Sequence, residues 1–219
     1  SVDLGAGNDK LTLGDFANVA TVGNVESIVG GSDADVITLS AALVLKSNIN
    51  LGAGSDKLIL GDFANVGSVE AIETLIGGAD ADTITYAGVA SNASIDLGMS
   101  DDTLTLGNFT NTATVAHVET IVGGTDDDTV TITTLLEGNA SIDLKAGNDK
   151  LVLGNFANIA TVSNVESLVG GSAGDTITLG AALTSNAIVD LGAGVDSLTL
   201  SNLANTGSIA NVESVLGGN

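Results

Sequence analysis

Glycine and aspartate recur together in two related phrases of this chain, and their spacing suits them to holding a cation. The first phrase reads LGAGNDKLTL at its first occurrence, and the second reads VGGSDADVITL. Glycine reaches backbone conformations in which carbonyl oxygens can turn toward a ligand, and aspartate adds a carboxylate beside them. Calcium takes about six to eight such oxygen ligands. The phrases therefore predict oxygen-rich turns that bind calcium.

The two phrases alternate along the chain and give nine turns, each closing on an aspartate. The closing residues are Asp9, Asp35, Asp56, Asp82, Asp102, Asp128, Asp149, Asp175 and Asp196, at alternating intervals of 26 and of 20 or 21 residues. Glycine and aspartate also form ordinary turns. Ordinary turns, however, do not require both residues in one fixed register nine times.

We predict that the calcium ligands come from the aspartates and glycines of these turns. Of the 20 aspartates, 14 lie inside them, which a merely solvated acidic surface would not require. The predicted acidic ligands are Asp9, Asp33, Asp35, Asp56, Asp80, Asp82, Asp101, Asp102, Asp126, Asp128, Asp149, Asp175 and Asp196. The predicted glycines are Gly5, Gly7, Gly30, Gly52, Gly54, Gly77, Gly123, Gly147, Gly170, Gly192 and Gly194.

The second phrase resembles the nonapeptide G-G-x-G-x-D-x-U-x of the RTX (repeats-in-toxin) family, as Gly30 to Thr38 shows. The glycine at the fourth position of that pattern is replaced by Asp33, Asp80 and Asp126 in the first three copies and by Ala173 in the last. The resemblance implies a calcium-stabilised parallel β-roll in which carboxylates and carbonyls of adjacent turns share each ion. It also implies a bacterial protein that is exported unfolded and folds outside the cell in calcium.

The turns belong to a longer repeat that spans the whole chain as a single array. Its copies cover about 3–49, 50–95, 96–142 and 143–189, with a partial copy at 190–219. Between turns, apolar and polar residues alternate, as in Lys10-Leu11-Thr12-Leu13, which predicts short strands. We therefore expect an all-β fold, a parallel β-roll or β-solenoid with about two coils per 47-residue repeat. The Gly/Asp turns would stack along one edge, and Leu11, Leu13, Ile37 and Leu39 would point inward.

The charge of the chain supports a cationic partner. With 27 acidic residues against 5 lysines and no arginine, the net charge is −22, which argues against nucleic acid and anionic membranes as partners. Two carboxylates about 4.8 Å apart repel by about 3.5 kcal/mol at an effective dielectric constant near 20. Stacked aspartates therefore need cations between them. No apolar run approaches the roughly 20 residues of a membrane span, so no membrane insertion is expected.

Two other residues recur once per repeat. Asparagine recurs at 18, 65, 111, 158 and 205, where it is expected to bond the loop backbone. Glutamate recurs at Glu26, Glu73, Glu119, Glu166 and Glu213, where either a bulge turns it outward or its carboxylate caps backbone groups. His117 is the single histidine and stands where other repeats have asparagine or alanine, so a metal or catalytic role is not expected.

Threonine offers a second candidate surface. If the strands after successive turns lie side by side, one outward row contains Thr12, Thr38, Ile59, Thr85, Thr105, Thr131, Val152, Thr178 and Thr199. A flat threonine array is similar to the ice-binding face of some β-solenoid antifreeze proteins. Ile59 and Val152 interrupt the row, and threonine is also a common outward residue of strands.

We expect a calcium-stabilised structural segment of a secreted bacterial surface protein, such as an adhesin stalk, an S-layer or an extracellular filament. The alternatives are an ice-binding threonine face and a calcium-binding accessory module of a secreted polysaccharide-modifying enzyme. Enzymatic activity is not expected, because the chain has no arginine, one histidine and one tyrosine. No distinct capping sequence closes the array, which leaves end-to-end or lateral self-association open.

Overall fold

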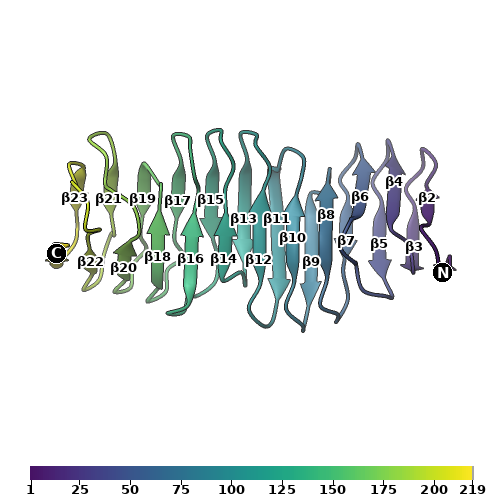
Figure 1. Ribbon diagram of the computed structural model, residues 1–219, viewed down its shortest axis with the longest axis horizontal. Coiled ribbons are helices and arrows are strands. Elements are labelled where there is room, and N and C mark those ends of the chain that lie inside the picture. Colours follow the sequence, from purple (N-terminus) through teal and green to yellow (C-terminus); the bar gives the residue numbers. More distant parts are fainter. Residues whose placement is uncertain (219) are drawn as a thin grey trace.

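The chain folds into a β-solenoid of two parallel sheets, as Figure 1 shows. The computed structural model describes residues 1–218 and contains strands without any helix in that range. Its coils stack along the long axis, from the N-terminus at one end to the C-terminus at the other. The prediction of an all-β parallel solenoid is confirmed.

The odd-numbered strands form one twelve-stranded sheet, the odd sheet, and the even-numbered strands form the other, the even sheet. The odd sheet contains β1 (Val2–Asp3), β3 (Val19–Gly23), β5 (Val36–Leu39), β7 (Lys57–Ile59), β9 (Thr74–Gly78), β11 (Ser91–Gly98), β13 (Thr112–Ala116), β15 (Thr129–Ile132), β17 (Lys150–Val152), β19 (Ser167–Val169), β21 (Ile188–Asp190) and β23 (Ser208–Ala210). The even sheet contains β2 (Lys10–Thr12), β4 (Ser27–Gly31), β6 (Ser47–Gly52), β8 (Val66–Glu70), β10 (Thr83–Tyr86), β12 (Thr103–Leu106), β14 (Thr120–Val122), β16 (Ala140–Asp143), β18 (Ile159–Ser163), β20 (Thr176–Leu179), β22 (Ser197–Thr199) and β24 (Ser214–Leu216).

Each coil is short and its length varies within the repeat. Val36 pairs with Val19, 17 positions earlier, and with Lys57, 21 positions later. In the even sheet Thr83 pairs with Thr103, 20 positions later. Twelve strands at about 4.8 Å per strand make each sheet about 53 Å long.

One 47-residue repeat contributes five strands, so it forms two and a half coils, where about two were expected. The additional chain reversal is the three-residue corner Asn24–Val25–Glu26 between β3 and β4. Because five is an odd number, equivalent strands of successive repeats lie in opposite sheets. Strand β2, for example, belongs to the even sheet, whereas its equivalent β7 belongs to the odd sheet.

The core lies between the sheets and consists of aliphatic side chains from alternate strand positions. Ile37 and Leu39 are buried, as predicted, and Ile84 and Leu104 repeat the pattern in the middle of the array. Leu11 and Leu13 pack against the core but are only partly buried, because they belong to the first coil. Each fully buried aliphatic side chain contributes roughly 1.5–3 kcal/mol. No helix that could span a membrane occurs in the described part of the chain.

The corners of the coils form two opposite edges. At edge I the chain passes from the odd sheet to the even sheet, and at edge II it passes back. The array continues without interruption through residue 218. Residue 219, the last of the partial repeat, lies outside the described residues.

Candidate functional site

The nine closing aspartates lie on both edges, so the prediction of a single stacked edge is wrong. Edge I contains Asp9, Asp82, Asp102, Asp175 and Asp196, and edge II contains Asp35, Asp56, Asp128 and Asp149. The physical reason is the odd number of strands per repeat, which moves equivalent turns to the opposite edge. The aspartate of a second phrase and the aspartate of the first phrase that follows it, such as Asp35 and Asp56, consequently lie in successive coils at the same edge. We call two such aspartates a pair.

Hydrogen bonds connect each pair to an asparagine in the preceding coil and a glutamate in the following coil. On edge II, the backbone N–H and the Nδ2 of Asn18 both donate to Oδ1 of Asp35 at 2.8 Å. The N–H of Asp35 donates to Oδ1 of Asp56 at 2.6 Å, and the N–H of Asp56 donates to Oε2 of Glu73 at 2.7 Å. Four successive coils are thus linked, because each Asp or Glu carboxylate accepts a hydrogen bond from a backbone N–H of the preceding coil.

We call this four-residue arrangement an Asn–Asp–Asp–Glu ladder, and residues 1–218 contain four of them. They are Asn18–Asp35–Asp56–Glu73, Asn65–Asp82–Asp102–Glu119, Asn111–Asp128–Asp149–Glu166 and Asn158–Asp175–Asp196–Glu213. The ladders alternate between edge II and edge I. Asp9 in the first coil makes only the last of these contacts, to Glu26 at 2.8 Å.

The ladders settle what the recurrent glutamate and asparagine do. The glutamate carboxylate caps the backbone N–H of an aspartate one coil earlier, which is one of the two roles that the sequence left open. Asparagine bonds its own loop, as Asn18 does through Nδ2 to the carbonyl of Phe16 at 2.6 Å, as predicted. Its additional bond to the aspartate in the next coil was not predicted. The 17-residue interval shared by Asn18–Asp35 and Asp56–Glu73 was the available sequence signal.

The ladder aspartates are buried, and most of them carry an oxygen that accepts no hydrogen bond. All eight paired aspartates are at most 2 % exposed. The Oδ2 atom is buried without a hydrogen-bond partner in seven of them, namely Asp35, Asp56, Asp82, Asp102, Asp149, Asp175 and Asp196, and also in Asp9. In Asp128 the Oδ2 accepts from the N–H of Gly124 at 3.2 Å, and the backbone N–H groups of Gly78 and Gly171 approach the carboxylates of Asp82 and Asp175 from the equivalent positions. A buried carboxylate oxygen without a partner is strongly unfavourable unless a proton or a cation neutralises it.

Burial and neighbouring carboxylates raise the pKa values of five paired aspartates, Asp56, Asp82, Asp102, Asp149 and Asp175. Burial is the largest cause for Asp102, whose pKa rises to about 7, with Asp82 and Glu119 adding repulsion. Burial likewise raises the pKa of Asp149 to about 6, with further repulsion from Asp128 and Glu166. The pKa of Asp56 is also raised, by burial first and then by the charges of Glu73 and Asp35. Within residues 1–218, the paired aspartate carboxylates have no positively charged partner that offsets their repulsion.

Glycine brings backbone oxygens of neighbouring coils close to these carboxylates. A Cβ atom on Gly77 would overlap the carbonyl of Leu97 in the next coil and lie 2.7 Å from Oδ2 of Asp82. A Cβ on Gly147 would lie 2.8 Å from both the carbonyl oxygen of Asp126 and Oδ1 of Asp149. Gly30, Gly123 and Gly170 face leucine carbonyls in the same way as Gly77, and Gly52, Gly54, Gly192 and Gly194 face carbonyls of the preceding coil. Gly5 and Gly7 lie in the first coil and have no such carbonyl nearby.

The predicted acidic residues outside the ladders occupy a different position. Asp33, Asp80, Asp101 and Asp126 are exposed on the outside of the turns. Asp101 accepts from Nδ2 of Asn139 at 2.8 Å, across an intervening corner. The structure therefore separates the predicted ligand set into buried ladder aspartates and exposed turn aspartates.

The oxygens around the buried pairs have the chemistry that a hard cation requires. Carboxylate and carbonyl oxygens are the donors, and calcium prefers oxygen ligands. Within residues 1–218 no three or more side chains of His, Cys, Asp or Glu converge as a metal-binding group. A cation at these turns would therefore be held by two carboxylates together with backbone carbonyls, and the residues present fit such an ion.

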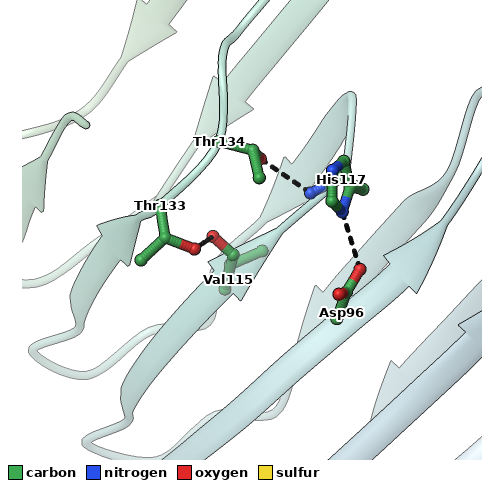
Figure 2. Close-up of polar contacts among 5 residues, drawn as sticks. All are labelled: Asp96, Val115, His117, Thr133 and Thr134. Atoms are coloured by element: carbon green, nitrogen blue, oxygen red, sulfur yellow. Dashed lines mark hydrogen bonds and ion pairs between the residues drawn. The ribbon is translucent and has the colours of Figure 1, made fainter. Parts of the chain in front are cut away.

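His117 takes the place of a structural asparagine. Figure 2 shows its ring directed at Asp96, with 2.8 Å between Nδ1 and Oδ1, while its backbone N–H donates to Oγ1 of Thr134 at 2.9 Å. Asn164 donates to Asp143 in the equivalent contact of another repeat, at 2.7 Å. His117 also shares the left-handed backbone conformation of the equivalent asparagines, with φ of 48°. The contact is therefore an architectural feature of the repeat.

The predicted threonine row does not exist, because its members lie in opposite sheets. Thr12, Thr85, Thr105, Thr178 and Thr199 belong to the even sheet, whereas Thr38, Ile59, Thr131 and Val152 belong to the odd sheet. The strand register instead aligns a different set of seven hydroxyl positions across seven successive strands of the even sheet, of which only Thr178 and Thr199 belong to the predicted row. They are Thr83, Thr103, Thr120, Ser141, Thr161, Thr178 and Thr199. We call these residues the hydroxyl row.

Comparisons of the chain with family models, with curated proteins and with solved structures found no match.

Proposed function

We propose that the chain is a calcium-stabilised structural segment of a secreted bacterial surface protein. The observation that carries the proposal is the pairing of buried aspartates in successive coils, with an Oδ2 that accepts no hydrogen bond on at least one member of every pair. The continuous two-sheet stack supports a mechanical role, since it extends along one axis with each coil contacting its neighbours. Secretion by a bacterium is supported by the resemblance of the turns to RTX repeats.

The chain's own residues explain why such a segment would fold only in calcium. Without a counter-ion, successive buried carboxylates repel each other and oppose stacking of their coils. The backbone N–H groups of Asp35 and Asp56 are already used within the ladder, so they add no further neutralising contact. Calcium, when bound, supplies positive charge and takes oxygen ligands. The aspartate carboxylates and the carbonyls beside Gly77 and Gly147 would hold it.

The concentration of calcium would then control where the segment folds. Extracellular calcium modules bind with dissociation constants of about 10⁻⁴ to 10⁻³ M, which cytosolic calcium does not reach. The chain would remain extended inside the cell and form its coils outside.

The test is a calcium titration of the chelator-treated chain at neutral pH, in which far-UV circular dichroism measures the strand content at each calcium concentration. We expect the strand signal to be weak in chelator, to rise with calcium over this concentration range, and to rise less with magnesium. A strand signal that is the same in chelator and in calcium would contradict the proposal. Activity of the isolated chain on alginate or another polysaccharide would contradict the expectation that the chain has no enzymatic activity.

The hydroxyl row supports a second candidate function, ice binding. Its seven positions are in register on one sheet, and successive members are about 4.8 Å apart. Asp143 lies beside the row and is paired with Lys145 at 2.7 Å, which reduces its charge there. An ice-recrystallisation assay in calcium tests this function. Inhibition that disappears in a Thr120→Lys/Thr161→Lys variant would support it, and no inhibition would contradict it.

A further inference from the structure

We infer that the chain binds four calcium ions, one at each Asp–Asp step of a ladder, alternately on its two edges. The steps are Asp35/Asp56 and Asp128/Asp149 on edge II, and Asp82/Asp102 and Asp175/Asp196 on edge I. This inference rests on the proposed function and adds to it the number, composition and position of the sites. Nine similar turns would otherwise suggest a continuous column of ions.

The first argument is the distribution of buried oxygens that accept no hydrogen bond. In three of the four steps both aspartates carry such an Oδ2, and these oxygens come from successive coils. In the remaining step only Asp149 does, because Oδ2 of Asp128 accepts from Gly124. The Oδ1 atoms of all eight residues already accept a backbone N–H. Oxygen available for a cation is therefore concentrated at the Asp–Asp steps.

The second argument is the asparagine that precedes each pair. Asn65 donates through its N–H and its Nδ2 to the same oxygen of Asp82, at 2.9 and 2.8 Å. Asparagine carries no charge and presents donors to the aspartate, so the Asn–Asp step offers no second carboxylate. The equivalent asparagines of the other three ladders make the same two contacts.

The third argument is the glutamate that follows each pair. Glu119 accepts the N–H of Asp102 at 2.8 Å, and it belongs to the three-residue corner His117–Val118–Glu119, which contains no glycine. At the Asp–Asp step two glycine-rich turns, each with its own aspartate, face each other, whereas the glutamate corner brings no glycine against the second aspartate. In the Asp82/Asp102 step, for example, a Cβ on Gly98 would overlap the carbonyl of Gly78. The glutamate thus ends the site.

Each ion would therefore join two neighbouring coils, and the next ion along the chain would join another two coils at the opposite edge. The alternation follows from five strands per repeat. Exposed turn aspartates such as Asp101 are excluded from this arrangement because they lie outside the stack.

The experiment counts calcium ions bound per chain at saturation, by equilibrium dialysis at pH 7.5, for the wild-type chain and for asparagine variants. Asparagine retains an oxygen that can accept the backbone N–H of the preceding ladder residue, Asn65 for position 82 and Asp82 for position 102, so the variants keep the ladder contact. The expected counts are four for wild type, three for Asp82→Asn, three for Asp102→Asn, three for the double variant Asp82→Asn/Asp102→Asn, and two for Asp102→Asn/Asp149→Asn. The control Asp101→Asn removes an exposed charge from the same turn and is expected to leave four.

The double variant Asp82→Asn/Asp102→Asn tests whether the two aspartates share one ion. If they do, replacing both removes a single ion, whereas two independent sites would lose two. A wild-type count other than four, a loss of two ions in Asp82→Asn/Asp102→Asn, or a loss of one in Asp101→Asn would overturn the inference while leaving calcium binding intact. Absence of any bound calcium would instead overturn the proposed function. Far-UV circular dichroism in saturating calcium checks that each variant is folded. If Asp102→Asn is not folded, the same substitutions at Asp175 and Asp196 are counted in its place.

Discussion

The backbone N–H of Asp82 donates to Oδ1 of Asp102 at 2.6 Å, which links two buried acidic residues in successive coils. Both residues are 1 % exposed, and the Oδ2 of each accepts no hydrogen bond. The same contact that aligns the coils therefore brings two carboxylates together. The relationship recurs in all four ladders, and it makes the stability of the stack depend on charge.

The first prediction concerns pH in the absence of divalent cations. Burial and the neighbouring carboxylates raise the pKa of Asp102 to about 7 and that of Asp149 to about 6. In the unfolded chain both carboxyl groups would titrate near pH 4. Between pH 4 and the raised pKa values, the folded chain therefore binds more protons than the unfolded chain. The free energy of unfolding should therefore fall as pH rises from about 4 to 7, by at most about 1.4 kcal/mol per pH unit for each group.

The folded fraction in chelator, followed by far-UV circular dichroism from pH 4.5 to 8, measures this dependence, since the chain is expected to be folded at the low end of the range and largely unfolded at neutral pH. The variant Asp102→Asn/Asp149→Asn lacks both groups and should show a shallower slope than wild type. A folded fraction that increases with pH across this range would contradict the prediction.

The second prediction concerns the glutamate that ends each ladder. Replacing Glu119 by alanine leaves the N–H of Asp102 without its acceptor, which should reduce stability in calcium by about 1–3 kcal/mol. Glu119→Gln retains an acceptor oxygen and should change stability by less than about 1 kcal/mol. Thermal melts compare the two, with the exposed Glu137→Ala as the control. Equal effects of alanine and glutamine would show that the hydrogen bond does not stabilise the corner.

The third prediction concerns the glycines that admit carbonyls of the next coil. A Cβ on Gly77 would overlap the carbonyl of Leu97, so Gly77→Ala should destabilise the chain by about 2–3 kcal/mol. At Gly138 the nearest atom to a new Cβ is Cγ2 of Ile159 at 3.7 Å, so Gly138→Ala should be within about 1 kcal/mol of wild type. Urea unfolding in calcium measures both. A neutral Gly77→Ala would be inconsistent with close contact between these coils.

The fourth prediction concerns the single histidine. Asparagine fills the equivalent position in three other repeats and donates to the same aspartate position, as Asn164 does to Asp143. His117→Asn should therefore leave the melting temperature and calcium binding unchanged, within about 0.5 kcal/mol. His117→Pro in the same assay is the disruptive control, because proline cannot adopt its positive φ of 48°. A loss of bound calcium in His117→Asn would assign a ligand role to the ring.

The sequence is sufficient to predict the parallel solenoid, because apolar alternation and glycine-aspartate turns are local and recur in register. Ile37 and Leu39 are buried as that alternation requires. The number of coils per repeat is harder to predict, since the corner Asn24–Val25–Glu26 contains neither glycine nor proline. Asn24 makes the reversal in a left-handed conformation with φ of 52°, which asparagine tolerates.

The missed corner also explains the errors at the candidate site. Without it, the repeat has an even number of strands, and all aspartate turns fall on one edge. With it, Asp35 and Asp56 share an edge while Asp82 and Asp102 share the other. The pairing of Asp56 with Glu73 depends on which coils are neighbours, so it could not be derived from composition or local pattern.

The most direct test of the central claim is the melting temperature in chelator and in calcium at pH 7.5, for wild type and for a variant with one substitution per step. The variant Asp56→Asn/Asp102→Asn/Asp149→Asn/Asp196→Asn removes the repulsion within every pair and retains the acceptor oxygens. A control with Asp15, Asp33, Asp62 and Asp80 changed to Asn removes the same charge from exposed positions. We predict that wild type and the control show little or no melting transition in chelator and melt cooperatively in calcium, whereas the ladder variant is folded in chelator and its melting temperature responds little to calcium. A ladder variant that is no more folded than wild type in chelator, or that keeps the full response to calcium, would contradict the account.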